Sequence, residues 1–235
     1  MTTAITYDPK NPATWSLFGA SHYVLGLDVG LMQDHSALVV GGVWPEANHA
    51  AGIVEIKQFG LGTPLHDVAS AAAGMAEQYR ARIVCDTSNN SAFPSILAPM
   101  LGGRPSDRLV AAVITNALTH ATTATPMVLT LAGQRVGIAR WTLSKRELIE
   151  AIGAEMGTGS LRFGKAGDWE VLRDELNALE REVRQSGSVS YAAPAGRHDD
   201  LVSALALCLF GLRRFAAQVR RAGPRQPAPS WAAWT

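Results

Sequence analysis

The apolar residues in the first half of the chain form short runs that are separated by Gly, Asp, Asn and Pro. Residues 63–81 have a helical composition, with Thr63 placed to cap a helix and Pro64 at its first position. A helix is therefore expected to follow three consecutive strands joined by short turns, which are predicted by the runs HYVLGLD (22–28), SALVVGGV (36–43) and GIVEIKQF (52–58).

The same pattern continues as far as residue 115. RIVCD (82–86) is too short for a helix and rich in β-branched residues, so it predicts a fourth strand. FPSILAPMLG (93–102) predicts a short helix, and LVAAVIT (109–115) predicts a fifth strand. The order βββαβαβ predicts an α/β fold with a mixed central sheet flanked by helices. The first three strands are expected to be antiparallel, and the fourth and fifth parallel to the first.

The second half of the chain begins with a predicted β-hairpin and continues as helices. Residues 127–141 read as two short strands around a Gly-Gln pair, an inserted hairpin that could stand off the main sheet. Residues 143–156 begin with Ser144 three residues before Glu147, which is a capping box. The apolar spacing of residues 168–185 predicts a second amphipathic helix.

The last predicted helix, residues 196–215, is apolar on most of its circumference, yet it begins with His-Asp-Asp. Such a helix should be largely buried. The chain beyond it is rich in Pro and Ala, which is typical of a flexible segment. The expected organisation is an N-terminal extension (1–20), one domain (21–217) and a C-terminal tail (218–235).

Composition excludes several classes of protein. Of the 235 residues, 47% are apolar and 17% are charged, as in an ordinary globular domain. The first twenty residues have neither a basic start nor a continuous apolar stretch, and no run reaches the roughly 18 apolar residues of a membrane span, so a cytoplasmic location is expected. Cys85 and Cys208 lie in apolar runs, which indicates reduced core residues instead of a disulfide or a zinc site.

The net charge of +1 does not decide whether the chain binds nucleic acid. The distribution of charge is more informative, since residues 213–225 hold five arginines and no acidic residue. This segment suits contact with phosphates. A solvated helix end is an equally good interpretation.

Acidic residues occur at the ends of predicted strands. Asp28 ends the first strand and Asp86 ends the fourth, and if these strands pair in parallel, both residues lie at one edge of the sheet, where ligands bind in open α/β folds. Asp199 or Asp200, at the start of the last helix, can reach the same point if this helix packs across the sheet. A turn at Asp28 and a helix cap at Asp199 are the alternatives that need no ligand.

Several carboxylates directed at one place repel each other, so that this arrangement is reasonable chiefly with a bound cation. Carboxylate oxygens favour Mg²⁺ or Mn²⁺ over zinc. Clusters of this kind commonly hold two ions about 3.5 to 4 Å apart, which promote hydrolysis of phosphodiesters. Phosphoryl chemistry is therefore the expected activity.

Three segments carry a resemblance to a known family: GLDVGLMQD, IVCDTSNN and GRHDDLVSALAL. In this order, on a βββαβαβ frame, they resemble the nuclease domain of the large terminase subunit of tailed bacteriophages, which has a ribonuclease H-like fold. The likeness covers roughly residues 20–215, and GRHDDLVSALAL is its most specific part.

The resemblance implies site residues. In the family, an aspartate of the first strand, an acid ending the fourth strand and an aspartate of the terminal motif bind two Mg²⁺ or Mn²⁺ ions. By position, the catalytic and metal-binding residues are Asp28, Asp86 and Asp200, with Asp199 as a neighbour, His198 nearby and Asp34 as an accessory acid of some members.

Basic residues are the expected DNA contacts. Lys145 and Arg146 occupy the place where the family often has a basic residue, before the helix that follows the hairpin. Arg135 at the hairpin tip and Arg140 on its second strand would contact phosphates if the hairpin stands near the acidic cluster. Alternatively, these four residues only solvate a surface.

The resemblance implies an endonuclease that cuts concatemeric double-stranded DNA with little sequence preference during viral DNA packaging, in the cytoplasm of the host. Its expected partners are a packaging ATPase, a small terminase subunit and a portal. The chain contains no G-x-x-x-x-G-K-[ST] phosphate-binding loop. It is therefore expected to be an excised domain or a nuclease encoded separately from its motor.

Three other functions stay open. The motif GLDVG also resembles the first phosphate motif of sugar kinases and actin-like ATPases. A different ribonuclease H-like enzyme, such as a junction resolvase or a transposase, would share the fold and the carboxylates. A packaging module that binds DNA without cutting it is the non-enzymatic alternative.

Overall fold

The first half of the chain follows the predicted order of elements. The computed structural model describes residues 20–31, 34–44, 50–116, 120–121, 123–164, 167–183 and 189–222. It contains strands β1 (His22–Asp28), β2 (Ala37–Trp44), β3 (Ala50–Gln58), β4 (Arg82–Asp86) and β5 (Leu109–Thr115), with helix α1 (Leu65–Gln78) after the third strand. Between β4 and β5 lie the short helices α2 (Phe93–Leu97), η3 (Ala98–Met100) and α3 (Pro105–Arg108).

One detail of α1 differs from the sequence-based prediction. The helix begins at Leu65, and Pro64, not Thr63, precedes it as the cap residue. The Thr63 hydroxyl donates to the Gly60 carbonyl instead, within the turn that leads into the helix.

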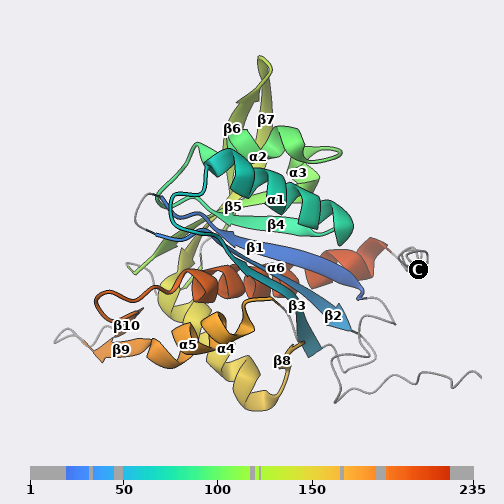
Figure 1. Cartoon of the computed structure of the whole chain (residues 1–235). Coiled ribbons are helices and arrows are strands. Elements are labelled where there is room, and N and C mark those ends of the chain that lie inside the picture. Colours follow the sequence, from blue (N-terminus) through green and yellow to red (C-terminus); the bar gives the residue numbers. More distant parts are fainter. Residues whose placement is uncertain are drawn as a thin grey trace, which may run out of the picture.

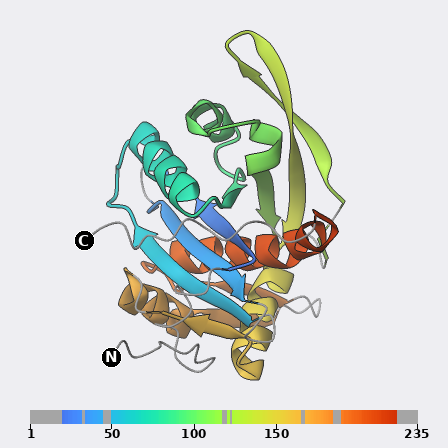
Figure 2. The ribbon, with the colours of Figure 1, turned by 90° about the vertical axis from the view of Figure 1, so that its right-hand side faces the viewer.

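Within the described residues, the sheet contains eight strands in the order β6-β7-β5-β4-β1-β2-β3-β8. As predicted, β1, β2 and β3 pair in an antiparallel manner, β4 is parallel to β1, and β5 is parallel to β4. Helices cover both faces (Figures 1 and 2). The strands bury a core against α6 on one face and another core against α1 and α2 on the other face.

The second half of the chain contains the predicted hairpin and three predicted helices, and it adds three strands that the sequence did not predict. The hairpin is β6 (Thr125–Leu131) and β7 (Gln134–Ser144), and the helices are α4 (Lys145–Thr158), α5 (Trp169–Ala178) and α6 (Asp200–Ala222). The added strands are β8 (Leu161–Phe163), β9 (Glu180–Val183) and β10 (Val189–Ala192). The predicted helix over residues 168–185 ends at Ala178, because the residues after it pair with β10 as strand β9. The capping box is confirmed in part, since the Glu147 amide donates to the Ser144 hydroxyl over 3.2 Å.

The predicted hairpin is present, but it does not stand off the main sheet. Strand β7 pairs with β5 in parallel from Val110↔Ala139 to Thr115↔Ser144, and β6 lies outside it as an edge strand. The hairpin extends past the start of β5, so its tip projects from the molecule (Figure 2). Strand β7 joins the sheet because its residues Trp141 and Leu143 are buried in the core under α6.

Two other expectations concern the whole chain. Cys85 and Cys208 are both free and buried, which confirms their assignment to the core. In the part of the chain that the structure describes, no helix is long and apolar enough to cross a membrane. The extension over residues 1–19 and the tail from residue 223 lie outside the described residues, and the predicted domain limits stay predictions.

Candidate metal centre and active site

Asp28 and Asp86 end two parallel strands that lie side by side. In the register of β1 and β4, Leu27 pairs with Cys85, so the next residues along the strands are neighbours at the same edge of the sheet. Val84, two residues before Asp86, is buried in the core under α6. Because side chains alternate along a strand, the Asp86 carboxylate belongs to the same face as α6.

Gly26 brings α6 close to this edge. A Cβ atom at Gly26 would lie 2.0 Å from the carbonyl oxygen of Ala204 and 2.4 Å from the amide nitrogen of Cys208, so the helix backbone packs directly on β1. Asp28 lies two residues further along the same face of β1, and Asp200 lies one helical turn before Ala204. The close approach therefore places the start of α6 over the end of β1.

The pKa of Asp28 reports this convergence. Burial raises the pKa well above its ordinary value, and the charges of Asp86, Asp200 and Asp199 raise it further, while a hydrogen bond with Ser203 lowers it. The four carboxylates come from β1, β4 and the start of α6. The structure thus brings together the acidic residues predicted at the two strand ends and at the terminal motif.

Asp86 is held in place by the loop that follows β4. Its Oδ1 atom accepts hydrogen bonds from the amide of Ser88 over 2.8 Å and from the Ser88 hydroxyl over 2.6 Å. The Ile114 amide donates to the same hydroxyl oxygen, and Thr87 donates to the Ala112 carbonyl. Burial raises the pKa of Asp86, and the hydrogen bonds from Ser88 oppose this change. Strand β5 therefore fixes the orientation of this carboxylate.

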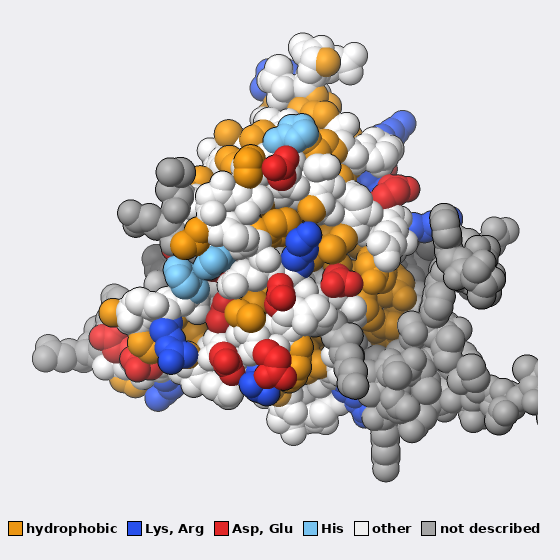
Figure 3. Space-filling model, viewed as in Figure 1, with side chains coloured by type: hydrophobic (Ala, Val, Ile, Leu, Met, Phe, Trp, Pro, Cys, Tyr) orange, Lys and Arg blue, Asp and Glu red, His pale blue; other side chains and the backbone are white. Residues whose placement is uncertain are grey.

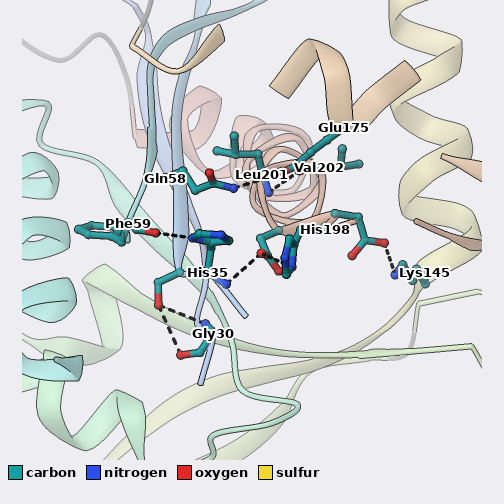
Figure 4. Close-up of polar contacts among 12 residues, drawn as sticks. Gly30, His35, Gln58, Phe59, Lys145, Glu175, His198, Leu201 and Val202 are labelled. Carbon is teal, nitrogen blue, oxygen red and sulfur yellow. Dashed lines mark hydrogen bonds and ion pairs between the residues drawn. The ribbon is translucent and has the colours of Figure 1, made fainter. Parts of the chain in front are cut away.

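Asp200 lies between two histidines. Its Oδ2 atom accepts the His35 amide over 3.1 Å and is 3.7 Å from Nδ1 of His198 (Figure 4). The two imidazole rings pack edge to face with centroids 5.0 Å apart, and Nδ1 of His35 contacts the Phe59 carbonyl oxygen. Burial raises the pKa of Asp200 to about 6, His198 and the His35 amide lower it, and the charge of Asp34 raises it. Asp34 itself is exposed.

Asp199 forms an ion pair with Lys145. The distance between Lys145 Nζ and Asp199 Oδ2 is 2.7 Å, and both side chains are about four-fifths buried, with 21% of each exposed (Figure 4). Lys145 is the first residue of α4, directly after the end of β7 at the same edge of the sheet. Arg146 is directed elsewhere and pairs with Glu150 on its own helix over 2.8 Å.

The comparisons with known proteins concern the fold. No family model and no curated protein matches the sequence. Among solved structures, the chain is similar to the large terminase nuclease of thermophilic phage G20c with bound magnesium, with 20% identity, a TM-score of 0.55 and coverage of 80% of this chain and 79% of that one. The chain shares the fold of this nuclease.

Two further structures show the same fold. The nuclease domain of the large terminase subunit of bacterial virus Sf6 is 16% identical, with a TM-score of 0.59 and coverage of 86% of this chain and 94% of that one. The human cytomegalovirus terminase nuclease domain, soaked with manganese and bound to an inhibitor, is 12% identical, with a TM-score of 0.54 and coverage of 86% and 87%. The ribonuclease H-like architecture predicted from the sequence is thus confirmed.

One buried carboxylate near the start of α6 was not predicted. Glu175 on α5 has 7% of its surface exposed, and its Oε2 atom accepts the amides of Leu201 and Val202 over 2.9 and 3.2 Å. The Gln58 side-chain amide donates to its other oxygen over 3.1 Å. Burial raises the pKa of Glu175 to about 7. A signal existed in the sequence, because Glu175 lies three residues after the buried Leu172 and so on the apolar face of its helix.

The hairpin arginines are not near the carboxylates. Arg135 lies at the start of β7, and the nine residues from it to Ser144 span roughly 30 Å, so Arg135 is at the opposite end of the sheet. Ile138 is buried in the core on the α1 side, so Arg140, two residues later, faces away from α6. The condition under which these arginines would contact phosphates at the acidic cluster is not met, because β7 joins the sheet from Ala139 to Ser144 and its start lies beyond the far edge.

Two arginines of the basic segment 213–225 have partners within the fold. Arg213 forms an ion pair with Glu155 on α4, and the Arg214 guanidinium lies 4.5 Å from the centroid of the Trp141 ring. On the face drawn in Figure 3, the described Lys and Arg side chains are interspersed with acidic ones and do not form a continuous basic surface. Lys145 is thus the predicted basic residue that the structure places at the site.

The donor atoms fit a hard divalent cation. They are carboxylate oxygens, and their mutual repulsion at Asp28 is the kind that a bound Mg²⁺ or Mn²⁺ ion relieves. Within the described part of the chain, however, no three Asp, Glu, His or Cys side chains are placed close enough together to hold an ion. An ion would therefore need side-chain rotations at this edge, and Asp199 would have to leave Lys145 to take part.

Proposed function

We propose that this chain is a divalent-metal-dependent endonuclease that cuts double-stranded DNA with little sequence preference, as part of viral DNA packaging. The observation that carries the proposal is the convergence of carboxylates from three separate segments of the chain, namely Asp28 on β1, Asp86 on β4 and the two aspartates at the start of α6. The fold supports it, since similar structures are terminase nucleases, one with bound magnesium and one soaked with manganese.

In this proposal, Asp28, Asp86 and Asp200 are the metal-binding residues, and Asp199 and Asp34 are accessory. Two bound Mg²⁺ or Mn²⁺ ions would supply an activated water and stabilise the leaving oxygen of a phosphodiester. The chain's own residues orient the carboxylates: Ser88 holds Asp86, and the His35 amide holds Asp200.

Lys145 has a second role in the proposal. Its ammonium group lies at the acidic edge, where the negative charge of the carboxylates opposes the approach of a DNA backbone. A cation at this position offsets that repulsion and can contact a phosphate without reading the base sequence. The lack of sequence preference follows from contacts of this kind.

The proposed partners are double-stranded DNA, a packaging ATPase, a small terminase subunit and a portal. Their support is the resemblance of the three sequence segments to the large terminase subunit. The chain has no phosphate-binding loop of the G-x-x-x-x-G-K-[ST] type, so the ATPase would be a separate domain or a separate protein.

Cleavage of supercoiled plasmid tests the proposal. We expect nicking and linearisation with Mg²⁺ or Mn²⁺, loss of both with EDTA, and loss of both in Asp28→Asn, which keeps the shape of the side chain and removes its charge. Asp107→Asn is the matched control, because Asp107 is exposed on α3, at the opposite edge of the sheet. An Asp28→Asn protein that cuts at the wild-type rate would overturn the proposal.

A further inference from the structure

The first turn of α6 is capped in an unusual way. The Ser203 amide donates to the Asp199 carbonyl over 2.8 Å, so Asp199 is the N-cap residue of the helix. An aspartate at this position ordinarily accepts the amides two or three residues later with its own side chain. For α6 these are the amides of Leu201 and Val202, and both residues are fully buried.

The side chain of Asp199 does not fill this role. Its Oδ2 atom contacts Lys145 instead, and the amides of Leu201 and Val202 donate to Glu175 on α5. Buried amides need a protein partner, because water does not reach them. Glu175 therefore performs the capping function that belongs to Asp199 by position (Figure 4).

Glu175 is itself fixed in place. Its second carboxylate oxygen accepts the side-chain amide of Gln58 at the end of β3, and the Gln58 backbone amide donates to Asp168 over 2.7 Å. Leu172 and Leu176, on the same face of α5, pack in the core under α6. The cap is thus held by β3 and by the packing of α5 under α6.

We propose that Glu175 is a positioning residue of the site: by capping α6 in place of Asp199, it leaves the Asp199 carboxylate free to face Lys145 and Asp28. The catalytic consequence rests on the proposed nuclease function. The exchange of caps is a structural claim that holds with or without that function. Without Glu175, Asp199 turns back onto its own helix and leaves Lys145.

A double-mutant cycle tests the exchange of caps. Asp199→Ala alone is expected to lower thermal stability only by the loss of its ion pair with Lys145, since Asp199 is not the working cap. The same substitution in a Glu175→Ala background is expected to lower the melting temperature by a larger amount, because Asp199 then caps the helix. If the effects of the two substitutions are additive, the proposal is overturned.

The reactivity of Lys145 with an amine-specific reagent, measured by mass spectrometry, gives a second readout. Glu175→Ala should raise the reactivity of Lys145 several-fold relative to Lys57, whose ammonium lies over the Phe59 ring. Glu175→Gln should not raise the reactivity of Lys145, because the amide oxygen of the glutamine still accepts the two helix amides. Equal reactivity in wild type and Glu175→Ala would contradict the proposal even if the alanine variant is less stable.

The response to Mn²⁺ tests the link to the site. Glu175→Ala should raise the Mn²⁺ concentration that half-saturates thermal stabilisation by roughly 10- to 100-fold, because an Asp199 carboxylate that has turned back to cap its own helix is no longer available to exchange Lys145 for the ion. Glu175→Gln should restore it. If the two substitutions are coupled but the Mn²⁺ response is unchanged, the exchange of caps is supported and its role at the site is overturned. If neither wild type nor any variant cleaves plasmid, only the proposed nuclease function is overturned.

Discussion

Neutralising Asp200 should stabilise the protein in the absence of metal. Asp200→Asn keeps the shape of the side chain and an oxygen for the His35 amide, but removes the negative charge from a residue that is 8% exposed. Burial and the nearby acids raise the pKa of Asp200 from its ordinary value of 3.8 to about 6. The ionised form is therefore less favourable in the folded chain than in the unfolded chain.

The magnitude follows from the pKa difference. A difference of one in pKa corresponds to about 1.4 kcal/mol, so the ionised Asp200 costs up to about 3 kcal/mol of the free energy of unfolding above pH 6. An acid in the first turn of a helix contributes up to about 1 kcal/mol through the helix dipole, which Asn loses. A net gain of about 2 kcal/mol is therefore expected for Asp200→Asn at pH 7.5.

The pH dependence has a definite sign. Because the folded pKa is the higher one, the folded chain binds more protons between pH 3.8 and about 6, and its stability falls as the pH rises through this range. The cost of the charge is nearly absent below pH 3.8, about half developed at pH 5 and complete by pH 7.5. The advantage of Asp200→Asn should grow in parallel.

Urea unfolding with EDTA at pH 5.0 and pH 7.5 measures this difference, with Asp107→Asn as the matched control for loss of an exposed acid. Millimolar Mn²⁺ should then reverse the order of stability, since wild type binds the ion in its folded form and the variant binds it poorly. A variant that is less stable than wild type at pH 7.5 without metal would refute the reasoning. So would an advantage that is equal at the two pH values.

Three other substitutions test separate parts of the site. Gly26→Val should destabilise the protein by at least 1–3 kcal/mol and weaken the Mn²⁺ response, because its Cβ atom would lie 2.0 Å from the α6 backbone; thermal melts with and without Mn²⁺ measure both effects. Ser88→Ala should move the acid limb of the pH–rate profile to higher pH, because Asp86 loses the hydrogen bond from the Ser88 hydroxyl and keeps only the one from the backbone amide of residue 88. Lys145→Ala should lower the slope of log affinity against log salt by about 1 on any duplex in Ca²⁺, whereas Arg104→Ala, before α3, should leave it unchanged.

Local patterns in the sequence were sufficient for the central sheet. The strands that end at Asp28 and Asp86 are short apolar runs whose limits coincide with the structure, because their central residues are buried on both faces and the polar residues stand at their ends. The parallel pairing of these strands then places the two carboxylates together, and this position could be predicted from the order of the strands alone.

The rest of the site depends on contacts between segments far apart in the sequence. The hairpin has the correct residues, but its direction is set by the pairing of β7 with β5, and the arginines on it consequently lie away from the carboxylates. Strand β9 replaces the last turns of a predicted helix, because pairing with β10 overrides the helical spacing of apolar residues.

Glu175 illustrates why capping could not be assigned from the sequence. The His-Asp-Asp motif contains an aspartate at the cap position, so local reasoning assigns the cap to Asp199. The structure gives the cap to an acid 24 residues earlier, which is buried between Gln58 and the start of α6. A carboxylate on the apolar face of an amphipathic helix needs a partner that donates hydrogen bonds, and the first amides of a buried helix are such partners. Packing of α5 against α6 therefore accounts for both acids: Glu175, on the apolar face of α5, accepts the first amides of α6, and Asp199, at the start of α6, pairs with Lys145 instead.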